Sequence, residues 1–153
     1  MNIINCISKW FWLKLFIIIA LAISVESTLA TSDYIIKVDS SSAVASLLNE
    51  AKDYYKAQQY EQAAALLERA LRIKPRHPII WHNLAGVRLA QDDWKRAANL
   101  AQKSNALAGT QEQYKNLRMR NWILITIACE GMGDENCTQE ARSRAQALAR
   151  ALN

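Results

Sequence analysis

The sequence predicts an all-α protein, an α-solenoid of about three stacked helix–turn–helix units, and three observations lead to that prediction. Apolar residues recur at helical spacing through most of the chain beyond residue 42. Proline and glycine interrupt this pattern at short intervals, notably at Pro75 and Gly109. Matched residues also return at a constant offset of 34 positions, in the pairs Asn49 and Asn83, Ala51 and Ala85, Tyr60 and Trp94, Ala63 and Ala97, Ala64 and Ala98, and Leu66 and Leu100. A fixed offset indicates that one structural unit has been copied.

The beginning of the chain has the three-part pattern of a secretory signal peptide. Two lysines and no acidic residue precede a short apolar core at residues 15–25, and small residues follow up to Ala30. We therefore expect residues 1–30 to be removed on export. The alternative is an uncleaved anchor formed by residues 10–30, although the apolar core is shorter than the ~20 residues that a transmembrane helix needs.

Cleavage would leave 123 residues, a length that suits one domain. The net charge would fall from +5 to +4, because two lysines and one glutamate leave with the signal. Such a mild positive balance favours acidic partners slightly. It falls short of the clustered charge that nucleic-acid binding needs, so we expect no nucleic-acid partner.

The first helix pair follows a short lead-in. Residues 31–42 mix small polar residues with a small apolar patch, and we expect this segment to be flexible. A helix is expected over residues 43–58, where apolar side chains fall every three or four positions. A second helix over residues 60–74 ends at Pro75, because proline cannot continue a helix.

The second pair repeats this arrangement. Pro78 suits the first turn of a helix, so the third helix is expected over residues 78–90. After a polar turn, the fourth helix runs over residues 94–107 and ends before Gly109.

The last pair contains the longest predicted helix, over residues 110–132. Thr110 and Gln113 have the spacing of a capping box at its start, and Gly131 and Gly133 are expected to stop it. A final helix, over residues 138–152, carries an apolar stripe with arginines on its other faces, as suits the polar cap of a stack.

Two cysteines follow the signal, Cys129 and Cys137. In an exported protein an even number of cysteines invites pairing, and the segment between these two is predicted to be a helix end and a turn. A disulfide there would clamp a helical hairpin near its bend. Two free thiols remain the alternative.

The 34-residue helix–turn–helix unit resembles the tetratricopeptide repeat. Counted from Val44, the unit has the residue types of that family at its signature positions, namely Leu47, Ala51, Tyr54, Ala63, Leu67, Ala70 and Pro75. A second unit, counted from Pro78, matches at Trp81, Leu84 and Ala85, but Arg88 replaces the usual aromatic residue. A third unit is weaker and contains Trp122. The resemblance implies a repeat domain over residues 43–153, with units at about 44–77, 78–109 and 110–153.

The resemblance implies a function in protein binding. In this family the first helices of successive units line a concave groove that holds a partner segment. The matching positions here predict the groove residues Leu48, Lys52, Tyr55, Ile79, His82, Leu89, Arg120, Ile123 and Ile127. Because these residues are mostly apolar with scattered positive charges, we expect an apolar or amphipathic protein segment with some acidic residues. They could instead pack against the lead-in at residues 34–38 or against a longer first helix.

The sequence therefore predicts a non-enzymatic scaffold or adaptor of the bacterial envelope. Together with the style of the signal, resemblance to small exported repeat proteins places it in the periplasm. If the signal is not cleaved, the protein becomes an inner-membrane subunit of an envelope assembly or secretion complex. No nucleophile and base can be paired for a hydrolase, and His77 and His82 lack the further ligands of a metal site, so we expect no catalytic residue, metal or cofactor.

Two basic segments remain outside this scheme. One surrounds the first proline and contains Arg69, Arg72, Lys74 and Arg76, and the other contains Lys115, Arg118 and Arg120. Each could meet an acidic partner or anionic lipid headgroups, or form a solvated helix face.

Overall fold

The computed structural model describes residues 43–152. The predicted signal, the alternative anchor and the lead-in therefore lie outside the described residues. The described part contains six α-helices, one 3₁₀ helix and no strand: α2 (Ala43–Lys56), α3 (Tyr60–Ile73), α4 (Pro78–Ala90), α5 (Trp94–Ala108), η1 (Glu112–Tyr114), α6 (Lys115–Met132) and α7 (Glu135–Leu152). None of the described helices combines the length and the apolar character that a membrane crossing requires.

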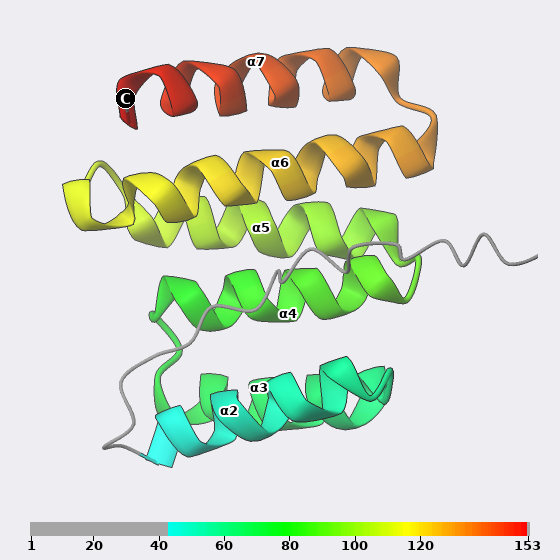
Figure 1. Ribbon diagram of the computed structural model, residues 1–153, viewed down its shortest axis with the longest axis vertical. Coiled ribbons are helices and arrows are strands. Elements are labelled where there is room, and N and C mark those ends of the chain that lie inside the picture. Colours follow the sequence, from blue (N-terminus) through cyan, green and yellow to red (C-terminus); the bar gives the residue numbers. More distant parts are fainter. Residues whose placement is uncertain (1–42, 153) are drawn as a thin grey trace, which may run out of the picture. The chain divides into compact units, whose positions relative to one another are not determined.

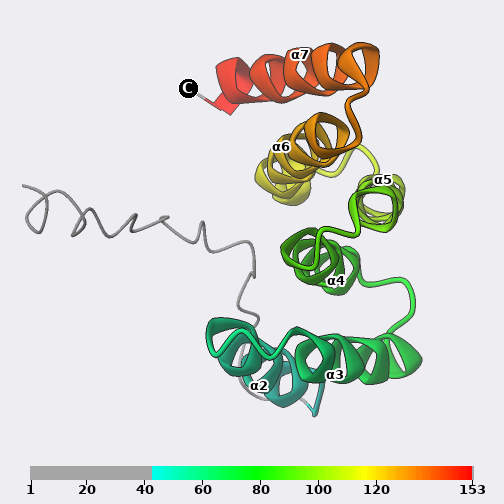
Figure 2. The ribbon, with the colours of Figure 1, turned by 90° about the vertical axis from the view of Figure 1, so that its right-hand side faces the viewer.

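The helices form a stack in which each packs against its neighbour in sequence (Figure 1). In addition, α4 contacts α6, so the first helices of the second and third pairs lie beside each other. Figure 2 shows α4 and α6 on one side of the stack and α5 on the other. The prediction of an all-α solenoid of helix pairs is therefore confirmed.

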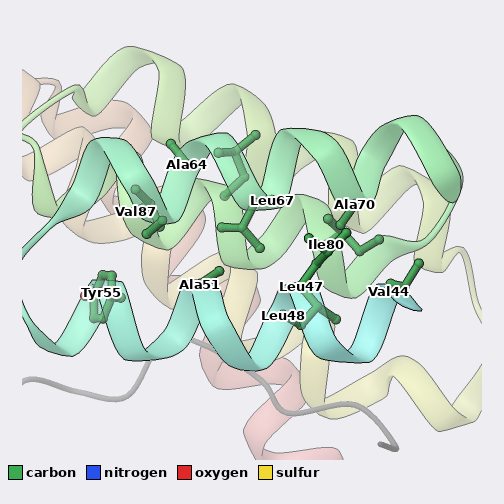
Figure 3. Packing of buried hydrophobic residues seen from close by; sticks show 12 residues of the cluster. Val44, Leu47, Leu48, Ala51, Tyr55, Ala64, Leu67, Ala70, Ile80 and Val87 are labelled. Atoms are coloured by element: carbon green, nitrogen blue, oxygen red, sulfur yellow. The ribbon is translucent and has the colours of Figure 1, made fainter. Parts of the chain in front are cut away.

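The core at the first end of the stack joins α2, α3 and α4. Figure 3 shows apolar side chains of these helices filling the space between them, including Leu48, Leu67 and Ile80. Ala51, Ala63 and Ala70 are fully buried where the helices approach, because a methyl side chain allows close helix contact. Leu67, Ala70 and Ile80 have no exposed surface at all.

A second core joins α4, α5, α6 and the start of α7. It contains the alanine pair that repeats the first unit, Ala97 and Ala98, together with Leu124 and Ile125 of α6. Leu100 packs against both cores, so the apolar interior continues from one helix pair to the next. Stacked repeats gain their stability from this continuity, because a single helix pair cannot bury its apolar face alone.

Arg88 occupies the α4 position where the repeat pattern has an aromatic residue. Its guanidinium lies 3.1 Å from a Glu68 carboxylate oxygen and 3.8 Å from one of Glu61, both on α3. Gln91 also binds Arg88 and donates to Glu61. The position therefore joins the first two helix pairs through charge rather than through ring packing.

The boundaries of the last pair differ from the prediction. The segment after Gly109 forms η1 before α6 begins at Lys115, and neither helix start has a side-chain cap. The predicted capping box of Thr110 and Gln113 is therefore wrong, and Gln113 instead binds Gln111. α7 begins three residues early, because Asp134 accepts a hydrogen bond from the backbone of Cys137 and so caps the helix.

The two glycines at the end of α6 have different roles. Gly133 ends the helix in the left-handed region, with φ of 71°. Gly131 lies inside the helix, so the prediction that it stops the helix is wrong. A Cβ atom at Gly131 would lie 2.5 Å from Cδ2 of Trp94, so this residue has to be glycine for the indole to pack against α6.

A disulfide joins Cys129, in the last turns of α6, to Cys137, in the first turn of α7. Their Cα atoms are 5.7 Å apart, within the usual range for a bridge. The bond closes the loop between the helices of the last pair, at the position that the sequence suggested.

Candidate functional site

Four of the predicted groove residues are buried. Leu48 and Tyr55 belong to the first core, and Leu89 belongs to the second. His82 is completely buried. In this structure these four side chains stabilise the stack and do not lie on its surface.

The other five predicted groove residues reach the surface to different degrees. Ile123 of α6 is the most accessible, with 40% of its surface exposed. Lys52, Ile79, Arg120 and Ile127 are partly buried. The accessible part of the predicted groove therefore centres on α6.

His82 takes part in a buried polar network between three helices. Its Nδ1 lies 2.6 Å from Oδ1 of Asn121 on α6. The amide nitrogen of Asn121 donates to Oγ of Ser104 at 2.8 Å and to Oδ1 of Asn105 at 2.9 Å, both on α5. Ser104 in turn donates to the carbonyl oxygen of Pro78, at the start of α4. The network thus connects α4, α5 and α6 through hydrogen bonds inside an apolar stack.

The network fixes the tautomer of His82. Because the Asn121 nitrogen is used in donating to α5, its oxygen faces the histidine and must accept a hydrogen bond. Nδ1 of His82 therefore carries the proton. His82 therefore has a structural role in this network and does not line a groove. The sequence gave one indication of its partner, since Asn121 is a polar residue between buried positions of α6.

A groove lies between α6 and α7 and includes the exposed Ile123. It has a volume of about 290 Å³ and is lined by Met119, Ile123, Thr126, Arg142, Ala145, Gln146 and Ala149. Its surface is mostly apolar, because four of its seven lining residues are apolar: Met119 and Ile123 of α6, and Ala145 and Ala149 of α7. Arg142 forms an ion pair with Glu130 of α6 at the edge of this helix pair. The groove was not predicted as such, since sequence reasoning placed α7 only as a cap.

A second hollow lies at the connection between α3 and α4. It has a volume of about 360 Å³ and is lined by Lys74, Pro75, Arg76, His77, Pro78 and Tyr114. Burial, followed by the positive charge of Lys74, lowers the pKa of His77 below its usual value. The imidazole is therefore neutral at pH 7, and the charge around this hollow comes from Lys74 and Arg76.

Metal ligands do not gather anywhere in residues 43–152, where no group of three or more His, Cys, Asp and Glu side chains has a suitable arrangement. His77 and His82 lie in different surroundings, one beside a surface hollow and one in the buried network.

Comparison with known proteins agrees with this architecture. The family model for the tetratricopeptide repeat matches residues 54–120. The solved structure of the globular C-terminal domain of LpoP from P. aeruginosa is similar, with 34% sequence identity and a TM-score of 0.65. The similarity covers 71% of this chain and 99% of the LpoP domain. The chain belongs to the tetratricopeptide repeat family. A search of curated proteins gives no match.

The tetratricopeptide repeat match begins near the end of α2 and extends to the first turns of α6. It therefore includes the two basic segments and most of the buried polar network. Solenoids of stacked repeats present extended surfaces to other proteins, so the fold is that of a protein-interaction module. The groove between α6 and α7 lies mainly beyond the matched repeats.

Proposed function

We propose that this protein is a non-enzymatic scaffold or adaptor of the bacterial envelope, which binds a segment of another protein on its repeat surface. The observation that carries the proposal is the apolar groove beside Ile123, on a fold that stacks helix pairs. A large apolar side chain exposed in a groove gains free energy when a partner removes it from water. The absence of a recognisable nucleophile and base in the sequence supports a binding role over a catalytic one.

The chemistry of the groove favours an amphipathic helix or an extended apolar segment as its occupant. Met119 and Ile123 supply apolar contact, whereas Arg142 and Gln146 supply polar contact. A partner helix that lays its apolar face in such a groove places its polar face outward. Acidic residues beside that apolar face would suit Arg142, the cation that lines the groove, in exchange for its ion pair with Glu130.

A cross-linking experiment tests the site. We expect a photo-crosslinking amino acid at position 123 to join a discrete partner in growing cells, whereas the same amino acid at the exposed position Asn99 of α5 will not. With the captured partner in hand, Ile123→Glu should weaken binding by at least about tenfold, because a carboxylate cannot be buried in an apolar contact without cost. Asn99→Glu adds the same charge and should leave binding unchanged. Equal capture at both positions would show that the groove has been misassigned.

The proposed location is the periplasm, reached by cleavage of the signal after Ala30. The alternative, an inner-membrane-anchored subunit of an envelope assembly or secretion complex, rests on the apolar run at residues 15–25. Cell fractionation with N-terminal sequencing separates the two. We expect a soluble periplasmic chain that begins at Thr31, and an intact N-terminus in the membrane fraction would establish the anchor instead.

A further inference from the structure

The hollow beside Lys74 is lined by two segments of the chain that are far apart in sequence. Four of its lining residues, at positions 74–77, belong to the α3–α4 connection, and Pro78 begins α4. Tyr114 of η1, in the α5–α6 connection, lines its other side. Both connections lie at the same end of the helices, on the left in Figure 1. The fold therefore places the two basic segments of the sequence at one end of the stack.

The two cations of this hollow, Lys74 and Arg76, lie two positions apart in the connection between α3 and α4. Arg88, Arg96, Lys115, Arg142 and Arg144 each form an ion pair with a carboxylate. Within residues 43–152, by contrast, no ion pair or hydrogen bond from the side chain of Lys74 or Arg76 is observed. Two neighbouring cations without a carboxylate leave a positive potential over the hollow, which favours an anionic ligand.

The rest of the lining adds polar and apolar contacts in fixed positions. Nδ1 of His77 is buried, and no hydrogen bond to it is observed from the described residues. The indole nitrogen of Trp81 donates to the carbonyl oxygen of Pro75 at 2.8 Å, which holds the α3–α4 connection against α4. The rings of Pro75, Pro78 and Tyr114 form the remaining walls. The hollow therefore offers positive charge at its edge and ring surfaces inside.

We propose that this hollow is a second docking site, for a short acidic segment of a partner protein. Carboxylates of the segment bind Lys74 and Arg76, and the neighbouring side chains of the segment pack on the proline and tyrosine rings. The volume of about 360 Å³ lies at the lower end of the range of ligand pockets and suits inserted side chains. The proline and tyrosine rings beside the two cations favour a peptide, whose side chains can pack on them, over lipid headgroups. The site is separate from the α6–α7 groove and can be tested independently of it.

The test uses the full-length protein and a fluorescein-labelled hexaglutamate peptide as the probe, with anisotropy measured at about 0.15 M ionic strength, where the Debye length is about 8 Å. We expect the double variant Lys74→Gln with Arg76→Gln to weaken binding at least about tenfold. The control variant Lys56→Gln with Lys95→Gln removes the same net charge from exposed residues near the opposite ends of the helices. It should change affinity less than about twofold, because charges beyond the Debye length are screened.

Tyr114→Ala separates a built site from a general attraction between charges, since it alters no charge. We expect this variant to weaken hexaglutamate binding at least about threefold while its circular dichroism stays unchanged. Equal losses in the two charge variants, or no loss in Tyr114→Ala, would overturn the proposal. So would equal binding of hexaglutamine. Binding to phosphatidylglycerol vesicles without binding to hexaglutamate would also overturn it, in favour of a membrane contact through the exposed Ile73.

Discussion

Replacing Asn121 with leucine will lower the free energy of unfolding by about 3–5 kcal/mol, because three hydrogen bonds inside the stack are lost together. Leucine has a similar volume, so the effect arises from polar groups rather than from a cavity. His82 and Ser104 are fully buried, and water cannot readily replace the lost amide. The variant should unfold at a lower urea concentration when followed by circular dichroism.

Asn116→Leu provides the matched control. Asn116 lies on the same helix but is exposed, so the same substitution there should change stability by less than about 0.5 kcal/mol. If the free energy of unfolding of Asn121→Leu lay within about 1 kcal/mol of that of the unaltered protein, the buried network would not be an important link between α4, α5 and α6.

Leu48→Glu is expected to destabilise the protein by more than about 4 kcal/mol, enough to unfold a domain of this size at moderate temperature. Leu48 is 1% exposed and belongs to the first core, so the substitution would place a carboxylate among apolar side chains (Figure 3). Thermal unfolding should show a large fall in Tm.

Two other variants make this result specific. Ser46→Glu adds the same charge to an exposed position of α2, and Ile123→Glu adds it to the exposed groove residue. Both variants should have a free energy of unfolding within about 1 kcal/mol of that of the unaltered protein. A stable, fully helical Leu48→Glu variant would contradict the burial of Leu48 and support its predicted place in a surface groove.

The Leu48→Glu and Ile123→Glu variants test how the predicted groove divides into buried and exposed residues. The family pattern places Leu48 and Ile123 at comparable positions of a concave face, and from sequence they are equivalent. In the structure Leu48 is buried and Ile123 is exposed, because the exposure of a helix face depends on how closely the neighbouring helix pairs pack against it. A site based on periodicity alone therefore contains both exposed residues and core residues.

The sequence was informative about local structure for a simple reason. Helical spacing, proline and glycine act over a few residues, so six helices could be predicted, with errors confined mainly to the starts of α6 and α7. The α7 error arose because the cap is Asp134, whose carboxylate binds the backbone of Cys137. The α6 error arose because a capping box can be matched by chance in a polar turn.

What the sequence determined by itself is the repeat: the 34-residue offset, the small residues at helix contacts, and thereby the family. Only the tertiary structure decided which of those residues meet. His82 and Asn121 are 39 positions apart, and Lys74 and Tyr114 are 40 apart, yet each pair belongs to one network or one hollow. The physical reason is that periodicity specifies the face of a helix, whereas contacts between distant helices depend on how the pairs stack.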